Sequence, residues 1–170
     1  ELMLYYAPGA CSLASHIALE ESGLPFEARP VNLLQGDQRV DSFLALNPKG
    51  RIPLLLTTAG PISESPAILE YVASMAPEAR LAPSNPYLAA KMRSFNCYLC
   101  ATVHVAHAHG PRGIRWADSD SALEELKSKV PHTMLAAFSL IEDQLAGSGG
   151  AQSARGEGAS EMGPWVLGDD

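Results

Sequence analysis

The sequence lacks the features that mark several specialised classes of protein. No apolar run approaches the ~20 residues that a membrane-spanning helix needs, so we expect no membrane segment. Basic residues are scarce as well: 12 Lys and Arg stand against 19 Asp and Glu, which gives a formal net charge of −7. A nucleic-acid or anionic-membrane partner needs a basic face, and this balance disfavours both. The N-terminus has no basic segment ahead of an apolar one, so we expect no signal peptide.

Cysteine is also sparse, with 3 residues that show no disulfide-framework spacing. An odd number of cysteines without such spacing favours free thiols in a reducing compartment, and the cytoplasm is the expected location. Hydrophobic residues make up 46% of the chain and charged residues 18%, which is typical of a globular protein. A chain of this length can bury one sizeable core or form two smaller subdomains.

The first 75 residues alternate short apolar segments with helical patterns and predict the order β-α-β-α-β-β-α. The first strand, helix and second strand are close enough in sequence to form a βαβ unit with parallel strands. The last two strands are joined by a tight turn and should be antiparallel. We therefore expect an α/β domain at residues 1–78. Its strands are expected at 2–6, 26–31, 52–57 and 62–63, and its helices at 12–22, 40–46 and 66–75, the last with Ser65 as N-cap.

The sequence changes character in its second half, where no alternation with period two remains. An all-helical domain is expected over 79–170, with helices at 86–109 and at about 120–145. Pro131 should kink or divide the second of these helices. Residues 147–163 are rich in Gly and Ser and predict a flexible loop.

The segment "YYAPGACSLASHIAL" places the lone Cys11 where a helix begins. Pro8 and Gly9 predict a turn directly after the first strand, so Cys11 should lie at the carboxyl end of that strand, where ligands usually bind in α/β sheets. A helix N-terminus favours an anion, and hence the thiolate over the thiol. The alternative interpretation is a small buried apolar residue. Because position 14 is Ala14 and not a second cysteine, an external thiol would have to complete any redox cycle.

Two further segments predict a binding site. Glu64 and Ser65 put an acidic side chain, a hydroxyl and free N–H groups at one helix start, which suits a ligand with a carboxylate and an ammonium group. The alternative is a plain N-cap beside an exposed glutamate. Ile52 and Pro53 open the third strand, where a cis proline would leave the Ile52 backbone free to pair with an extended peptide. Together with the thiol, these features predict a pocket for a small thiol peptide.

These segments resemble one known family. "LYYAPGACSLASHIALEESG", "LNPKGRIPLLL", "SESPAILEYVA" and "GPWVLGDD" are similar to the bacterial glutathione S-transferases, most of all to the beta class. The resemblance covers nearly the whole chain and is strongest over residues 4–75. It implies a thioredoxin-like domain followed by an all-helical domain. It also implies a homodimer, and glutathione as a co-substrate that is bound mostly by the first domain.

The resemblance implies roles for four residues near the sulfur. Cys11 matches the cysteine that contacts the sulfur of glutathione and can form a mixed disulfide with it. Tyr6 matches a tyrosine close to that site, and His104 matches a histidine of the helical domain that faces the thiol. Ser12 is the rival of Cys11, because other transferase classes activate glutathione with a serine hydroxyl near this position.

The rest of glutathione is implied to lie along the other two segments. Ile52 and Pro53 match the residues whose backbone pairs with glutathione, and Glu64 and Ser65 match the clamp for its γ-glutamyl group. The sequence departs from the beta class elsewhere: residues 34–36 lack the lysine of that loop, which removes one expected contact with a glutathione carboxylate. Cys97 stands where the beta class usually has an asparagine that reaches glutathione across the dimer. The family pattern would continue past residue 170, so we expect either a truncated chain or one of which only a part is given.

The segment "CYLCATVHVAHAH" carries Cys97, Cys100, His104 and His107 on one helical face. Cys97 and His107 are about 15 Å apart along a helix that rises 1.5 Å per residue, so one ion cannot bind all four. Two of these side chains could bind zinc only together with ligands from elsewhere in the chain. We therefore expect no metal site here, and we expect this helical face to point toward the interdomain cleft. We expect no chemical role for His16 and His132, which should lie on a helix surface or in the core. Arg112 and Arg115 are expected to be solvated loop charges, with an anionic substrate site as the alternative.

The leading hypothesis is a glutathione S-transferase that conjugates the thiolate of glutathione to an electrophilic, hydrophobic small molecule, as in detoxification. Two alternatives stay open. Cys11 could carry glutathione itself, which would make the protein a glutathione-dependent reductase of mixed disulfides. Transferase folds also serve as non-catalytic binding modules.

Overall fold

The computed structural model describes residues 1–146, which divide into two units. Unit 1 spans residues 1–83, and unit 2 comprises the described residues that follow. The boundary lies after Pro83 rather than after residue 78, because Leu81 still packs against the hydrophobic core of unit 1. The loop expected at 147–163 lies outside the described residues.

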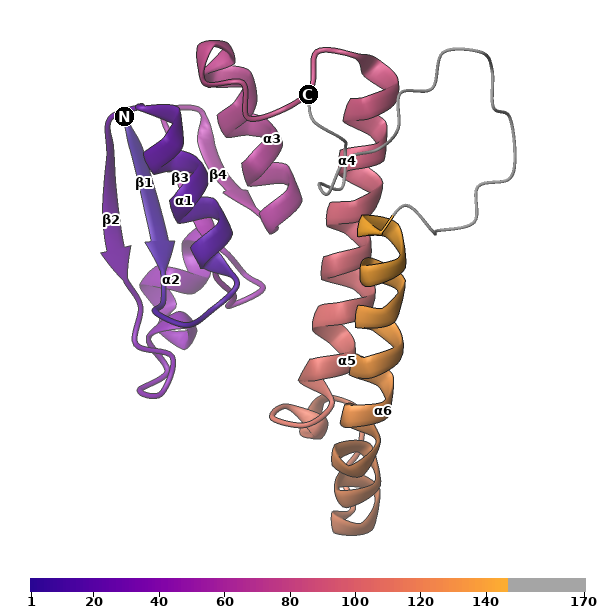
Figure 1. Ribbon diagram of the computed structural model, residues 1–170. Helices are drawn as coiled ribbons and strands as arrows, with labels where there is room; N and C mark the ends of the chain where they lie inside the picture. Colours follow the sequence, from indigo (N-terminus) through magenta and orange to yellow (C-terminus); the bar gives the residue numbers. More distant parts are fainter. Residues whose placement is uncertain (147–170) are drawn as a thin grey trace. The chain divides into compact units, whose positions relative to one another are not determined.

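Unit 1 contains a mixed sheet whose strands are β1 (Leu2–Tyr6), β2 (Phe26–Pro30), β3 (Leu54–Thr57) and β4 (Gly60–Ser63). Their order in the sheet is β2-β1-β3-β4 (Figure 1). β1 and β2 are parallel, and β3 is antiparallel to both β1 and β4, which confirms the two pairings expected from the sequence. β3 begins at Leu54 rather than at Ile52, because Pro53 has no N–H group to donate to the ladder.

Helices cover both faces of this sheet; they are α1 (Ser12–Ser22), α2 (Asp41–Leu46) and α3 (Ser65–Met75), with short 3-10 turns η1 (Asp37–Arg39) and η2 (Pro77–Ala79). Neighbouring strand residues point to opposite faces. Leu55 therefore joins the core that α1 and α3 cover, while Leu54 packs with Phe43 of α2 on the other face. This arrangement confirms the thioredoxin-like β-α-β-α-β-β-α order expected from the sequence.

Helix α3 begins differently from the expectation. Ser65 is its first residue rather than its N-cap, and Glu64 takes the N-cap position with a φ of 75°. A positive φ is uncommon for a residue other than glycine. Here it turns the chain from β4 into the helix, which therefore begins one residue before the position expected from the sequence. The Glu64 side chain makes no capping hydrogen bond, so its carboxylate is available to other groups.

Three segments that are far apart in the sequence meet at one edge of the sheet. Tyr5 pairs with Leu54, and Leu54 pairs with Ser63, so these residues form one row across β1, β3 and β4. β3 runs opposite to the two strands beside it. The loop after β1, the segment before β3 and the residues after β4 therefore leave the sheet at the same edge.

Unit 2 is helical in its described part, with α4 (Pro86–Tyr98), η3 (Leu99–Val103), α5 (His104–Ala108), η4 (Gly113–Arg115) and α6 (Asp120–Leu145). The first three follow one another as the single helix that the sequence predicts, and η3 is a π-helical turn within it that the sequence does not reveal. Asn85 caps α4, because its Oδ1 accepts hydrogen bonds from the N–H groups of Tyr87 and Leu88 at 2.9 and 3.2 Å. Ser119 caps α6, and Pro131 lies inside α6 without dividing it.

Helix α6 lies beside η3 and α5 (Figure 1). The hydroxyl of Tyr98, the last residue of α4, donates a hydrogen bond to the Ala137 carbonyl of α6 at 3.1 Å. Leu135, Phe138 and Leu140 of α6 are exposed. Among the helices of residues 1–146, none is long and apolar enough to cross a membrane.

Leu55→Ala should lower the free energy of unfolding by about 2–5 kcal/mol, because Leu55 is fully buried and its truncation leaves a cavity in the core of unit 1. Leu34→Ala is the matched control: Leu34 is fully exposed, so the change should stay within about 0.5 kcal/mol. Urea unfolding followed by circular dichroism measures both values. Equal losses in the two variants would contradict the core assigned to unit 1.

Candidate functional site

The loop between β1 and α1 presents a cysteine to solvent. Gly9 has a φ of 69°, which suits the turn expected at Pro8 and Gly9. The Ala10 N–H donates a hydrogen bond to the Ala7 carbonyl at 3.3 Å and closes this turn. Cys11 follows at the N-cap position of α1 and is exposed. The exposed position excludes the alternative interpretation of a buried apolar residue.

Ser12 closes the same loop from the inside. Its side chain is fully buried, and its Oγ accepts a hydrogen bond from the Ala7 N–H at 3.1 Å and donates one to the Ala7 carbonyl at 3.2 Å. A serine hydroxyl has a single proton, so the proton of Ser12 is engaged within the loop. Of the two neighbours, Ser12 holds the backbone together and Cys11 is the group that a ligand can reach.

The thiol of Cys11 lies beside the segment that precedes β3. Its Sγ is 3.8 Å from the carbonyl oxygen of Ile52, to which it donates a weak hydrogen bond. The peptide bond between Ile52 and Pro53 is cis, as the sequence predicts. Ile52 is partly exposed, whereas Pro53 is buried. An exposed thiol and an accessible strand end are therefore neighbours in unit 1.

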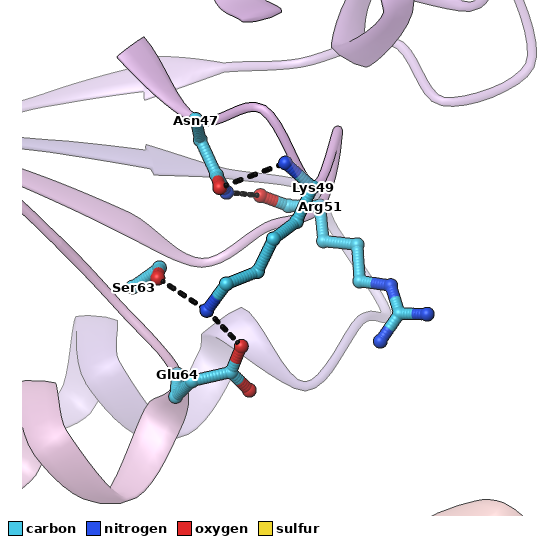
Figure 2. Close-up of polar contacts among 5 residues, drawn as sticks. All are labelled: Asn47, Lys49, Arg51, Ser63 and Glu64. Carbon is cyan, nitrogen blue, oxygen red and sulfur yellow. Dashed lines mark hydrogen bonds and ion pairs between the residues drawn. The ribbon is translucent and has the colours of Figure 1, made fainter.

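The carboxylate of Glu64 lies at the same sheet edge and is paired with a lysine. The Nζ atom of Lys49 is 2.6 Å from Oε1 of Glu64 and 2.9 Å from Oγ of Ser63 (Figure 2). The side chains of Lys49 and Glu64 are 49% and 60% exposed, so solvent screens their attraction. Exposed ion pairs of this kind contribute about 0–1 kcal/mol, which is weak enough for another cation to replace the lysine.

Polar groups of the loop itself fix the backbone around Lys49 (Figure 2). Asn47 is buried; its Nδ2 donates to the Arg51 carbonyl at 2.7 Å, and its Oδ1 accepts from the Lys49 N–H at 3.3 Å. Gly50 has a φ of 58°, and a Cβ atom there would lie only 2.9 Å from Nη1 of Arg39. The loop is thus closely packed, while the Lys49 side chain extends from it toward β4.

The sequence did not indicate Lys49 as part of this site. The available signal was a lysine between Pro48 and Gly50, within a segment that already carried the family resemblance. Lys49 contacts Ser63 and Glu64 because the pairing of β3 with β4 brings these two residues beside the segment that precedes β3. Helical or strand periodicity cannot reveal a contact of this kind.

Tyr6 has an aromatic partner on α1. Its ring lies 4.9 Å from that of His16, measured between centroids, and the His16 ring lies 5.7 Å from that of Phe26. His16 also approaches Glu20, with 3.5 Å between Nε2 and Oε1. These contacts agree with a packing role for His16. The action of Tyr6 on a ligand sulfur stays a prediction.

Unit 2 carries the other candidate residues. Arg112 is partly buried rather than a solvated loop charge, and its Nη1 lies 3.4 Å from Nε2 of His104. Because a guanidinium group only donates, Nε2 of His104 is the acceptor. Cys97, Cys100 and His107 are exposed, and nowhere in the described part of the chain do three His, Cys, Asp or Glu side chains gather as a metal site would need. The roles of His104 and Cys97 toward glutathione stay predictions.

Comparisons with known sequences find relatives among the glutathione S-transferases. A family model described as the N-terminal domain of glutathione S-transferase matches residues 9–75. The glutathione S-transferase GstA of Escherichia coli O157:H7 is 40% identical over 106 residues, which cover 61% of this chain and 53% of that protein. A maleylacetoacetate isomerase of Pseudomonas aeruginosa is 30% identical over 155 residues, which cover 88% of this chain and 71% of that protein. The chain thus spans only about half the length of GstA.

Solved structures agree with these sequence relatives. A glutathione transferase homologue from Sulfitobacter, with bound glutathione, has 41% identity and a TM-score of 0.84, and the match covers 99% of this chain and 74% of that chain. A beta class glutathione S-transferase from Sphingomonas chungbukensis has 33% identity and a TM-score of 0.69, with 84% of this chain and 69% of that chain covered. The second match supports the closeness to the beta class that the sequence motifs indicate.

Ser12→Ala should lower the free energy of unfolding by about 1–3 kcal/mol, because it leaves the buried N–H of Ala7 without its partner and removes one of the two hydrogen bonds that the Ala7 carbonyl accepts. Cys11→Ala is the neighbouring control and should stay within about 0.5 kcal/mol, because its side chain is exposed. Urea unfolding of the two variants gives the comparison. A stable Ser12→Ala protein beside an unstable Cys11→Ala protein would reverse the roles assigned to these neighbours.

Proposed function

The chain belongs to the glutathione S-transferase family, and from this premise we propose that it binds glutathione along the sheet edge of unit 1 and transfers it to an electrophilic, hydrophobic small molecule. The observation that carries the proposal is the exposed thiol of Cys11 at the start of α1, 3.8 Å from the Ile52 carbonyl. A thiol and a free strand end side by side suit a cysteine-containing peptide in extended form. Glutathione is such a peptide.

The three groups of glutathione fit the three segments of the site. Its cysteinyl backbone pairs with Ile52 beside the cis Pro53, as a short added strand would. Its γ-glutamyl ammonium meets the carboxylate of Glu64, and its γ-glutamyl carboxylate meets Ser65 and the N-terminus of α3. Its sulfur then lies toward Cys11. The register that aligns Tyr5, Leu54 and Ser63 supports this order of contacts along the edge.

In the proposed conjugation, the thiol of glutathione loses its proton to solvent. The thiolate sulfur donates an electron pair to the electrophilic carbon, and the leaving group departs with the electrons of the broken bond. The N-terminus of α1 favours negative charge on the sulfur, and the S–H group of Cys11 is a nearby weak donor to it. Further donors proposed from the family resemblance are Tyr6 and His104.

The exposure of Cys11 also favours a second reaction, the reduction of mixed disulfides. The Cys11 thiolate would attack the glutathione sulfur of a substrate–glutathione disulfide and release the substrate as a thiolate. A second glutathione thiolate would then attack the Cys11–glutathione disulfide, which frees Cys11 and forms glutathione disulfide. Both steps are exchanges between thiolates and disulfides, so no other oxidant is needed.

Activity assays separate the possible reactions. Similarity to a maleylacetoacetate isomerase makes isomerisation a third reaction to measure, beside conjugation of an aryl halide and reduction of a glutathione mixed disulfide. A protein that binds glutathione but turns over none of these substrates would be a non-catalytic binding module. Between Cys11 and Ser12, the buried and engaged hydroxyl of Ser12 supports Cys11 as the residue beside the sulfur.

The assembly and location of the protein are further parts of the proposal. We propose a homodimer, as the family resemblance implies; Leu135, Phe138 and Leu140 of α6 are among the apolar side chains exposed in the described residues. We propose a cytoplasmic location, because Cys11, Cys97 and Cys100 form no disulfide, as expected in a reducing compartment.

Incubation with glutathione disulfide should add one glutathione to the protein through Cys11, with release of one glutathione. The thiol of Cys11 is exposed to the disulfide, and α1 offers no second cysteine to resolve the adduct. Intact-mass measurement detects the adduct, which should disappear in Cys11→Ala and persist in Ser12→Ala.

Cys97→Ala and Cys100→Ala are the controls, because both of these thiols are exposed as well. They should leave the adduct on Cys11 in place. No adduct on Cys11, together with a loss of conjugation only in Ser12→Ala, would show a serine-type enzyme in which Cys11 is a bystander.

A further inference from the structure

The carboxylate that is expected to bind the ligand already holds an ammonium group of the chain itself. Nζ of Lys49 lies 2.6 Å from Oε1 of Glu64 and 2.9 Å from Oγ of Ser63 (Figure 2). Building on the proposed glutathione site, we propose that Lys49 is an internal competitor for the ligand's ammonium group. It occupies Glu64 in the free protein and must leave when an amino-terminal γ-glutamyl group binds.

The chemistry of the two ammonium groups makes them direct alternatives. Lysine Nζ and the α-amino group of a γ-glutamyl residue are both primary ammonium ions with three N–H donors. Lys49 directs donors at Oε1 of Glu64 and Oγ of Ser63, and its positive charge repels a second cation at the same carboxylate oxygen. The binding free energy of a ligand ammonium at this oxygen is therefore only the difference between two interaction free energies, that of the ligand with Glu64 and that of Lys49 with Glu64.

The exposure of the pair makes the exchange feasible. Both side chains are about half exposed, so the pair contributes little to stability and Lys49 keeps a strong interaction with water when it leaves. The backbone beneath it does not have to move, because Asn47 holds the Lys49 N–H and the Arg51 carbonyl through its own side chain. Rotation of the lysine side chain alone is enough to uncover Glu64.

This competition has a consequence for selectivity. A ligand with an ammonium group must displace Lys49, whereas a ligand without one leaves the pair intact. Lys49 therefore reduces the preference of the site for ligands that carry the ammonium group. The relevant quantity is the ratio of two dissociation constants, that of glutaryl-cysteinylglycine, which is glutathione without its amino group, divided by that of glutathione.

Calorimetric titration of both ligands into the full 170-residue chain tests the proposal. Lys49→Met should raise the ratio about two- to five-fold, the range that an exposed ion pair covers. Lys49→Arg keeps the cation and should leave the ratio near the wild-type value. Lys127→Met is the matched control, because it removes the same charge from another exposed lysine–glutamate pair, that of Lys127 with Glu124, and should not change the ratio.

Two results distinguish a failure of this proposal from a failure of the glutathione site. Glu64→Gln should abolish the preference for the ammonium group; an unchanged ratio in that variant would overturn the placement of the γ-glutamyl group and the competition with it. If Glu64→Gln abolishes the preference but Lys49→Met leaves the ratio unchanged, only the competition is overturned. A lower ratio in Lys49→Met would also overturn it, because Lys49 would then orient Glu64 for the ligand.

Discussion

The pairing of β3 with its two neighbours is the constraint on which the site depends. It aligns Tyr5, Leu54 and Ser63 in one row, although these residues are far apart along the chain. Cys11, Ile52 and Glu64 each follow or precede a member of this row by a few residues. A shift of the register by one residue would turn Leu54 from the core beneath α2 to the opposite face, so burial of the core fixes the register. The same hydrophobic packing that stabilises unit 1 therefore brings the site together.

Adjacent residues at this edge divide structural and chemical roles between them. Ser12 is buried and holds the Ala7 backbone, and its neighbour Cys11 is exposed. Pro53 is buried beside the partly exposed Ile52. Asn47 is buried and holds the loop from which the exposed Lys49 extends. In each case, a residue held by the interior fixes the position of one that faces solvent.

Much of this arrangement was predictable from the sequence, because it rests on backbone signals. Pro8 and Gly9 indicated the turn before Cys11, and the short connections indicated which strands pair as parallel or antiparallel. Other features depend on contacts between distant side chains or on an unusual backbone conformation. The ion pair of Lys49 with Glu64 is a contact between distant side chains. The positive φ of Glu64 is an unusual backbone conformation, and because of it the sequence prediction of Ser65 as the N-cap of α3 was wrong. The contact between Arg112 and His104 was also missed, because proximity across a helix end has no periodic signal.

The central claim is that glutathione lies along this edge with its sulfur at Cys11 and its ammonium group at Glu64. A crystal structure of the chain with glutathione tests it most directly. The account predicts a ligand sulfur beside Cys11 Sγ, a cysteinyl backbone paired with Ile52, and a γ-glutamyl ammonium in the place that Lys49 Nζ holds in the free protein. Glutathione bound elsewhere, with Lys49 still paired to Glu64, would contradict it.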